Sequence, residues 1–432
     1  MKKSVILGAA LSAFAIASAS GQPAAFTAGN IVVRQIGVDG GGTALNNAAT
    51  RTFLKEITTG GTVVQTIDLP FMAATSGNRA INTSGSATSE GALTLSADGR
   101  YLVCVGYNAD AGTTAVVSTT AATVNRVVGL IDCNAVIDTT TAFGDGYDAN
   151  NIRSATSSDG TDIWTAGNAT GSGGGARYVV RGGTTTVALN APTLPVNLRY
   201  INIDNGNLFV SSASGNFLGV SQVGTGLPTT SGQTVTLLPG FPVPPVTPTP
   251  SSYDFWFADA NTLYVADDRS IANGGGIQKW TLSAGTWSLA YTLNTGITVG
   301  VRAFCGMVVA GTPVLYATTA TANATNGNAL VTVTDTGAAS AFSTIATSGP
   351  NTWWMGVDFA PTCGATGPTC YPNCDLSTIV PFLNVNDFTC FLNKFAANDT
   401  YANCDGSTTP PVLNVNDFTC FLNKFAAGCS AP

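Results

Sequence analysis

The sequence predicts an all-β domain followed by a small α-helical tail, and the β domain is expected to be a six-bladed, alternatively seven-bladed, β-propeller. From residue 30 to residue 361 the chain is rich in Val, Thr, Gly and Ala and almost free of helical periodicity, which favours strands. A strand–turn–strand unit recurs in this region about every 45 to 60 residues, as in propeller blades. The last sixty residues instead contain one thirty-residue loop–helix unit written twice.

The first residues have the three parts of a secretory signal peptide. Lys2 and Lys3 precede an apolar run from Val5 to Ala17, and the small residues that end at Ala19 fit a cleavage site. The run is too short to span a membrane. We therefore expect residues 1–19 to be removed on export and the mature protein to be secreted or held at the cell surface, without membrane insertion.

Charge and composition exclude several classes of function. The formal net charge is −7, and loss of Lys2 and Lys3 with the leader makes it −9, which argues against nucleic acid and anionic membrane surfaces as partners. The chain has no histidine, so Ser-His-Asp hydrolysis, His general-base catalysis and His-ligated metal sites are excluded. A pair of carboxylates remains able to hydrolyse a glycosidic bond.

The propeller, expected over residues 26–361, is built from repeating units. In the clearest three, a strand runs into a tight turn at Asp98-Gly99, Asp159-Gly160 or Asn205-Gly206 and an apolar strand follows. The five units cover residues 92–105, 152–164, 198–210, 253–266 and 302–317. Residues 353–360 are expected to join strands from residues 30–69, which gives a sixth blade and closes the ring without exposed sheet edges.

One segment of the ring resembles a known family. Leu95-Ser-Ala-Asp-Gly-Arg-Tyr-Leu102 resembles the blade turn of secreted lactonase-like propellers, and residues 30–361 are similar to secreted bacterial propellers. The motif is short, and a tight Asp-Gly hairpin serves the geometry of any propeller. The resemblance therefore implies the fold and no defined activity.

Aligning the units predicts a ligand site at one mouth of the ring. The candidate residues fall near the start of the innermost strand in each blade: Arg153, Arg199, Arg302, Glu90, Asp254 and Trp354. Guanidinium groups suit the carboxylates or sulfates of a polysaccharide. The alternative is that the arginines form salt bridges between neighbouring blades, with Glu90 and Asp254 as their partners.

Residues 362–372 are expected to form a linker, and residues 373–432 a tandem repeat. The two copies are identical at 21 of 30 aligned positions. In each copy a Cys-Asp pair opens a polar loop, Leu-Asn-Val-Asn-Asp follows, and apolar residues then recur at helical spacing. The order of elements resembles a dockerin, a duplicated half EF-hand. The Ala427-Gly428-Cys429 ending is similar to the Gly-Cys-ending dockerin-like anchors of secreted bacterial proteins.

The resemblance implies calcium ligands and a partner. Carried over position by position, the ligands are Asp375 and Asp405 (first), Ser377 and Ser407 (third), Asn384 and Asn414 (ninth), and Asp387 and Asp417 (twelfth). Ile379 and Thr409 replace an acidic fifth ligand, so any Ca²⁺ affinity is expected in the weak range of about 10⁻⁴ to 10⁻³ M. The alternative is that disulfides have replaced calcium and that Asp387 and Asp417 are helix N-caps. The implied partner is a cohesin-like or other surface receptor.

Ten cysteines in an exported chain indicate disulfides. In the large domain, Cys104 and Cys133 fall on strands expected to be neighbours, and Cys305 and Cys363 fall on segments expected to meet where the ring closes. The pairing of the six cysteines in the tail is left open: Cys370, Cys374, Cys390, Cys404, Cys420 and Cys429.

The sequence therefore predicts a non-catalytic propeller that is displayed or anchored at the cell surface through its tail and that binds an extracellular ligand. The alternative is a propeller enzyme, a glycoside hydrolase or lyase, that acts on extracellular carbohydrate through carboxylates near the channel. A pair of carboxylates in an open pocket favours the enzyme, whereas arginine–acid pairs at the mouth favour binding or a structural role.

Overall fold

The computed structural model describes residues 23–41, 43–190, 194–321, 327–363, 371–375 and 383–428. The expected signal peptide, most of the expected linker, Ser377, Ile379, Cys370 and Cys429 lie outside these ranges. Within them the chain forms six four-stranded antiparallel sheets and two α-helices. The predicted six-bladed propeller with a small helical tail is thus confirmed.

In each blade four strands follow one another from the innermost strand outward. The closing blade contains β26 (Trp353–Phe359), β1 (Ile31–Ile36), β3 (Thr52–Ile57) and β4 (Val63–Asp68). The second contains β6 (Leu93–Leu95), β7 (Tyr101–Tyr107), β8 (Arg126–Asp132) and β9 (Ile137–Phe143). The third contains β10 (Ile152–Ser157), β11 (Asp162–Gly167), β12 (Gly175–Val180) and β13 (Val187–Ala188).

The remaining blades follow the same plan. The fourth contains β14 (Ile201–Asp204), β15 (Asn207–Ser214), β16 (Phe217–Val223) and β17 (Val235–Leu237). The fifth contains β18 (Ser252–Asp259), β19 (Thr262–Asp267), β20 (Gly276–Ser283) and β21 (Thr286–Leu293). The sixth contains β22 (Val301–Val309), β23 (Thr312–Thr319), β24 (Ala329–Thr334) and β25 (Ser343–Thr347). Short elements complete the ring: the β2 (Ala49–Thr50) and β5 (Thr83–Ser84) pair, and 3₁₀ turns η1 (Val116–Ser118), η2 (Gly171–Gly173) and η3 (Ile271–Asn273).

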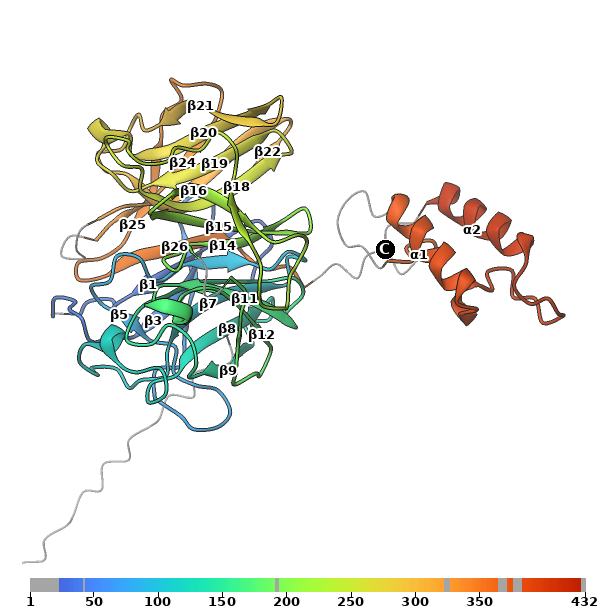
Figure 1. Ribbon diagram of the computed structural model, residues 1–432, viewed down its shortest axis with the longest axis horizontal. Helices are drawn as coiled ribbons and strands as arrows, with labels where there is room; N and C mark the ends of the chain where they lie inside the picture. The colour runs from blue at the N-terminus through green and yellow to red at the C-terminus, as the bar shows by residue number, and fades with distance from the viewer. Residues whose placement is uncertain are drawn as a thin grey trace, which may run out of the picture.

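The ring closes through strands from its two ends. β26 pairs antiparallel with β1, with Ile31 opposite Phe359 and Ile36 opposite Trp353, and the two lie side by side in Figure 1. Around the ring β26 contacts β6, β6 contacts β10, β10 contacts β14, β15 contacts β18, and β22 contacts both β18 and β26. The predicted mixed closing blade is therefore present, and no innermost strand of these six is left without a neighbour.

Side chains of the innermost strands bind the backbone of the next innermost strand. The bonds are Thr94 Oγ1 to Ala155 O (2.6 Å), Ile201 N to Ser154 Oγ (2.9 Å), Phe304 N to Asp254 Oδ2 (3.1 Å) and Leu95 N to Asp358 Oδ2 (2.6 Å). An innermost strand has one edge without a partner in its own sheet, and buried backbone groups require partners. These polar side chains therefore join blades while satisfying that edge.

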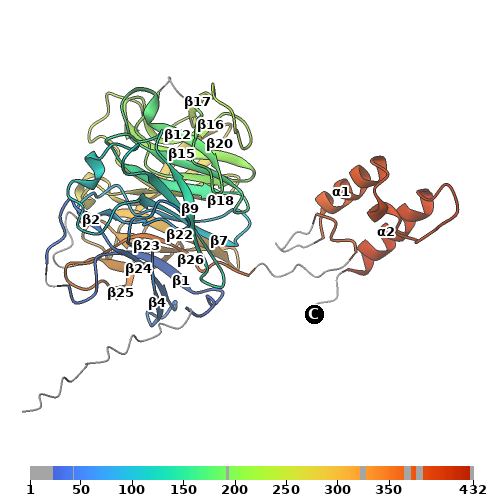
Figure 2. The ribbon, with the colours of Figure 1, turned by 90° about the horizontal axis from the view of Figure 1, so that it is seen from below.

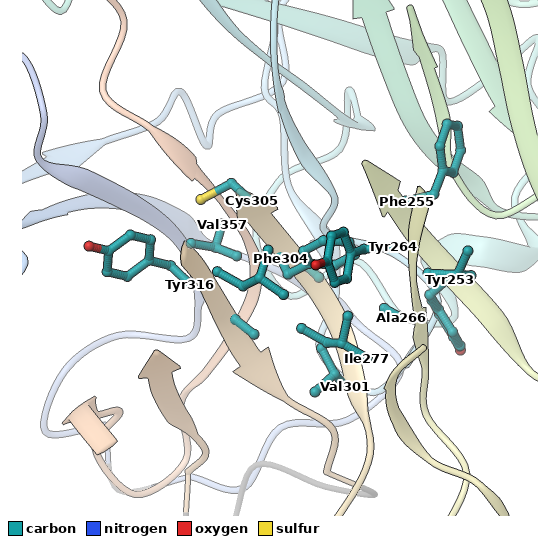
Figure 3. Close-up of a cluster of buried hydrophobic side chains, with 14 of the residues drawn as sticks. Tyr253, Phe255, Tyr264, Ala266, Ile277, Val301, Phe304, Cys305, Tyr316 and Val357 are labelled. Atoms are coloured by element: carbon teal, nitrogen blue, oxygen red, sulfur yellow. The ribbon is translucent and has the colours of Figure 1, made fainter. Parts of the chain in front are cut away.

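Apolar packing between the blades forms the core. The largest buried cluster gathers side chains from the fourth, fifth and sixth blades and from the closing blade. Figure 3 shows part of it, where Phe304 of β22, Tyr264 of β19 and Val357 of β26 meet. Each sheet therefore buries its faces against the neighbouring sheets, which explains why its strands lack a simple alternation of apolar and polar residues.

The cysteines of the ring pair differently from the expectation. Cys133 forms a disulfide with Cys363, which follows β26, and Cys104 and Cys305 are free and buried. The strands β7 and β8 are neighbours as expected, but their register places Cys104 opposite Gly129, and Cys133 pairs with Cys363 instead. Phe26 N also donates to Cys133 O (2.7 Å), so one turn holds both ends of the ring.

The tail consists of two matching halves. Helices α1 (Val385–Ala396) and α2 (Val415–Ala427) lie side by side in Figure 2, and the 3₁₀ turn η4 (Thr400–Ala402) lies between them in the sequence. The rings of Phe391 and Phe421 are stacked with centroids 4.2 Å apart, and both side chains are fully buried. The disulfides Cys374–Cys390 and Cys404–Cys420 occupy equivalent positions in the two repeats. None of the helices in the described ranges has the length and apolar character that a membrane crossing needs.

Candidate functional site

The three predicted arginines lie near one another, and two of them lie over one aromatic ring. Tyr253 is the second residue of β18, and the guanidinium carbon of Arg199 lies 4.0 Å from its ring centroid. The guanidinium carbon of Arg302 lies 5.9 Å from the same centroid. Burial, and then the nearby charge of Arg199, lower the pKa of Arg153 to about 10. We call these three arginines and Tyr253 the arginine cluster.

Irregularities in strand pairing occur at two of these arginines and direct their side chains. Arg153 and Arg302 are each the second residue of an innermost strand, β10 and β22. At both positions the strand register shifts, so that the arginine has no partner on the next strand of its own sheet. Such β-bulges redirect side chains and are common beside functional sites. The pairing of β18 is also interrupted around Tyr253.

Each arginine also binds the neighbouring blade. Arg153 Nη1 donates to Asn197 Oδ1 and to Leu198 O (3.0 Å), and Arg199 Nη1 donates to Ser251 Oγ (2.8 Å). Arg199 Nη1 also donates to Ser252 O (3.3 Å), Arg302 Nη1 donates to Thr321 O (2.6 Å), and Arg302 Nε forms an ion pair with Asp268 Oδ2 (3.1 Å). Among the residues that the structure describes, buried Arg153 Nε has no hydrogen-bond partner. The arginines therefore link neighbouring blades, and the N–H group of Arg153 Nε remains an unused donor.

The acidic partners expected for the arginines serve other groups. Glu90 is buried and accepts hydrogen bonds from Ser84 N (2.9 Å), Tyr107 OH (2.5 Å) and Asn151 Nδ2 (2.6 Å). Burial raises its pKa, against these bonds and the charge of Arg153. Trp354 is also buried, and its Nε1 donates to Gln35 Oε1 (3.0 Å). Glu90 forms no ion pair with an arginine among the described residues.

Asp254 faces a different site. Its two oxygens accept from Phe255 N (2.8 Å) and Phe304 N (3.1 Å), and it lines a cavity of about 220 Å³ between the innermost strands. We call this the axial cavity; its polar lining is Thr94, Ser96, Asn202, Asp254, Cys305 and Asp358. Adjacent residues of a strand point to opposite faces. Tyr253 is therefore the residue of β18 that meets the arginines.

The axial cavity holds two carboxyl groups that form no ion pair within the described part of the chain. Burial raises the pKa of Asp358 to about 7. Burial, with a further contribution from Asp358, raises the pKa of Asp254 well above its usual range. Burial and then the two carboxyls raise the pKa of the Cys305 thiol. The cavity therefore favours protonated, uncharged groups.

In the tail, the expected ninth and twelfth calcium ligands form helix caps. Asp387 Oδ2 accepts from Asn384 N (2.8 Å) and its Oδ1 from Asp375 N (3.3 Å). The second repeat has the same bonds, from Asn414 N (2.8 Å) and Asp405 N (3.2 Å) to Asp417. Asn384 and Asn414 are the N-caps and the aspartates are the third helical residues, so each pair completes a capping box.

Two other expected ligands of the second repeat, Asp405 and Ser407, form hydrogen bonds within their own loop. Ser407 Oγ donates to Val412 O (2.9 Å), and its N donates to Asp405 Oδ1 (2.9 Å). No group of three or more metal-ligating side chains occurs within the described ranges. The alternative interpretation named Asp387 and Asp417 as N-caps, and the structure assigns that position to the asparagines.

Sequence reasoning missed three residues beside the arginines: Tyr253, Ser251 and Asp268. The position of Tyr253 within its strand could have identified it from the sequence. Counted from the start of each innermost strand, Tyr253 is the equivalent of Arg153 and Arg302, whereas Asp254 is one residue further along. A slip of one residue exchanges the two faces of a strand.

The comparisons with known proteins end at the fold. A putative 6-phosphogluconolactonase from Bacteroides uniformis shares 12% identity, covers 77% of this chain and 83% of its own, and gives a TM-score of 0.40. The apo form of the soluble aldose sugar dehydrogenase from Escherichia coli shares 10% identity, with coverages of 64% and 91% and a TM-score of 0.37. A Lactobacillus plantarum protein shares 12% identity, with coverages of 76% and 99% and a TM-score of 0.36. No family model and no curated protein matches the chain.

Proposed function

We propose that this protein is a secreted binding protein, in which the propeller holds an acidic ligand at the arginine cluster and the tail attaches to a surface receptor. One observation carries the ligand site: the guanidinium groups of Arg199 and Arg302 lie over Tyr253, the charge of Arg199 acts on Arg153, and of these three arginines only Arg302 has an ion-paired carboxylate within the described residues. The protein as a whole is acidic, with a net charge of −7. The local excess of positive charge therefore needs an explanation, and an anionic ligand supplies one.

The chemistry of the cluster favours a carboxylated or sulfated polysaccharide. A guanidinium group presents a planar fork of donors that matches carboxylate and sulfate oxygens. Arg153 Nε is buried without a partner, and an unused buried donor is costly unless a ligand or water engages it. The bulges at Arg153 and Arg302 add support, because they give up ladder hydrogen bonds to direct these side chains.

The test is removal of the three charges. The triple variant Arg153→Gln, Arg199→Gln, Arg302→Gln is expected to lose retention on polygalacturonate and dextran sulfate columns. A control changes Arg51, Arg100 and Arg181 to Gln. Both variants lose three positive charges, so the change in net charge is matched. The control arginines differ in having carboxylate partners and more exposed side chains. Equal loss in both variants contradicts a specific site.

A melting experiment on the same variants separates binding from structure. Glu90 and Asp254 are hydrogen-bonded to other groups, so the triple change strands neither of them, and Asp268 is the carboxylate that loses its ion-pair partner. We expect a modest fall in stability, from lost bonds to the neighbouring blades at about 1 kcal/mol each. Unchanged retention with a lowered melting temperature eliminates the ligand site in favour of a purely structural role.

The proposed anchoring role rests on the exposed apolar side chains of the tail. Val385 and Val415, at equivalent positions of the two helices, are each 73% exposed. A groove of about 490 Å³ lined by Leu383, Val385, Phe388, Leu422 and Phe425 lies beside the first of them. Apolar side chains around a groove suit a receptor of the cohesin-like class or another surface protein.

Cell binding tests the anchor. The full-length protein is expected to bind intact cells of the producing strain, and Val385→Asp with Val415→Asp is expected to abolish that binding. Added Ca²⁺ at millimolar concentration strengthens it if the degenerate loops bind the ion weakly. Binding that survives the double change contradicts the proposed surface.

A second candidate function has its own observation. Asp254 and Asp358 share the axial cavity, and two carboxyls in one cavity are the minimum for a glycoside hydrolase or a lyase. Both oxygens of each already accept backbone N–H groups, so the observation favours a structural role. Release of reducing or unsaturated sugar from an acidic polysaccharide, lost in Asp358→Asn, supports the enzyme.

A further inference from the structure

Two arginines of the cluster are joined through one carboxylate. Asp268 follows β19, and its Oδ2 accepts from Arg302 Nε (3.1 Å). Its Oδ1 accepts from Ser251 Oγ (2.6 Å), and Ser251 Oγ in turn accepts from Arg199 Nη1 (2.8 Å). The chain Arg199–Ser251–Asp268–Arg302 therefore spans the cluster beside Tyr253.

The neighbouring carboxylate has a different role. Asp267 is fully buried, pairs with Arg269 (2.8 Å) and accepts from Ser251 N (3.1 Å). The side chain of Asp268 is 16% exposed, similar to Arg302 at 11%. Asp267 therefore binds groups of its own loop and of the residue that precedes β18, whereas Asp268 lies beside the guanidinium groups that the ligand would use.

We propose that Asp268 is a built-in counter-ion that sets the affinity of the arginine cluster for acidic ligands. This inference rests on the proposed function. Asp268 orients Arg302 directly and Arg199 through Ser251, and it cancels one of the three positive charges. An acidic ligand must share Arg302 with this carboxylate, and the repulsion between two anions a few ångströms apart weakens binding.

The variant Asp268→Asn tests the charge. The amide oxygen still accepts from Ser251, and Arg302 keeps its bond to Thr321 O (2.6 Å) and its contact with Tyr253. Arg199 therefore keeps its bond to Ser251, and Arg302 loses its carboxylate acceptor but keeps these two contacts, while the negative charge is removed. We expect the Kd for polygalacturonate oligomers, measured by calorimetry at low salt, to fall roughly tenfold, as charges at this range in a partly exposed site imply. The salt dependence of Kd is expected to steepen.

Two further variants make the outcome decisive. Asp259→Asn, an exposed change at the other end of β18, removes the same charge and is expected to leave Kd unchanged. Ser251→Ala cuts the link to Arg199 without a change of charge and is expected to weaken binding several-fold with the same salt dependence. Unchanged or weaker binding by Asp268→Asn overturns the proposal. Absence of binding by the wild type to every acidic polysaccharide overturns the proposed function itself.

Discussion

The propeller and the tail reach stability by different routes. The propeller packs six sheets against one another and, within the described residues, has one disulfide, which links Cys133 after β8 to Cys363 after β26. The tail has two short helices, a small aromatic core around Phe391 and Phe421, and two disulfides in its described part. A chain of about sixty residues buries too little apolar surface to be stable on that basis alone. Disulfides therefore contribute a larger fraction of the stability of the tail than of the ring.

The two regions nevertheless use buried acids in the same way. Asp254 and Asp358 in the ring accept N–H groups of the next blade. Asp387 and Asp417 in the tail accept N–H groups at the start of a helix. In both regions a carboxylate satisfies backbone donors that no regular hydrogen-bond ladder reaches. An acidic residue here is therefore weak evidence for catalysis or metal binding.

The largest expected effect is the loss of the tail on reduction. The two disulfides contribute about 2–4 kcal/mol each, against a small core. All six tryptophans belong to the ring and both α-helices of the described ranges belong to the tail, so tryptophan fluorescence and the helical circular dichroism signal report on them separately. Reductant is expected to remove the helical signal at temperatures where the fluorescence is unchanged. Greater loss with chelator than with reductant contradicts this and indicates tight metal binding.

The next effect concerns the axial cavity and pH. The folded pKa of Asp358, about 7, lies above the unfolded value of about 3.9. Its contribution to stability is therefore complete below about pH 4 and is lost as the pH rises through about 7, a change of about 4 kcal/mol. Denaturant unfolding followed by fluorescence should show a ring that is more stable at pH 5 than at pH 8.

Asp358→Asn is expected to reduce that pH dependence and to stabilise the ring at pH 8. The amide oxygen still accepts from Leu95 N, Phe359 N loses its acceptor, and the absence of a buried charge at high pH outweighs that loss. The exposed turn residue Asp159, changed to Asn, serves as the control and should leave the slope unaltered. A wild-type ring whose stability rises between pH 5 and pH 8 rules out this account of the cavity.

The disulfide of the ring should matter less to its own region than the tail disulfides do to theirs. Cys133→Ser with Cys363→Ser opens a link across 230 residues, and the expected loss is about 2–4 kcal/mol. The ring should remain folded, because β26 still pairs with β1 and the blades still bury one another. The fluorescence transition is expected to shift to lower denaturant while the helical signal of the tail stays the same. A ring that fails to fold without this link contradicts the comparison.

The sequence was sufficient for the ring because blade formation is local. Turns such as Asp98-Gly99 and Asn205-Gly206 mark hairpins within single blades, and the unpaired strands at the two ends of the domain pointed to the closing blade. Contacts between blades could not be predicted from local sequence patterns. The partners of Cys133 and of Asp254 depend on strand register and on bulges, and a slip of one residue changes the face on which a side chain lies.

The smallest expected effect separates a helix cap from a calcium ligand. Asn414 Oδ1 accepts from Asn416 N (2.9 Å), and Asn414 N donates to Asp417 Oδ2 (2.8 Å). Asn414→Ala removes the side-chain half of this capping box and is expected to cost about 1 kcal/mol, read from the helical signal of the tail. The cost should be equal with Ca²⁺ and with chelator, because a cap acts on the helix alone. Ser407→Ala, at the other expected ligand position of this loop, should likewise show no difference between the two conditions. If either cost appears only when Ca²⁺ is present, that residue acts as a metal ligand, and the tail is stabilised by the ion as well as by its disulfides.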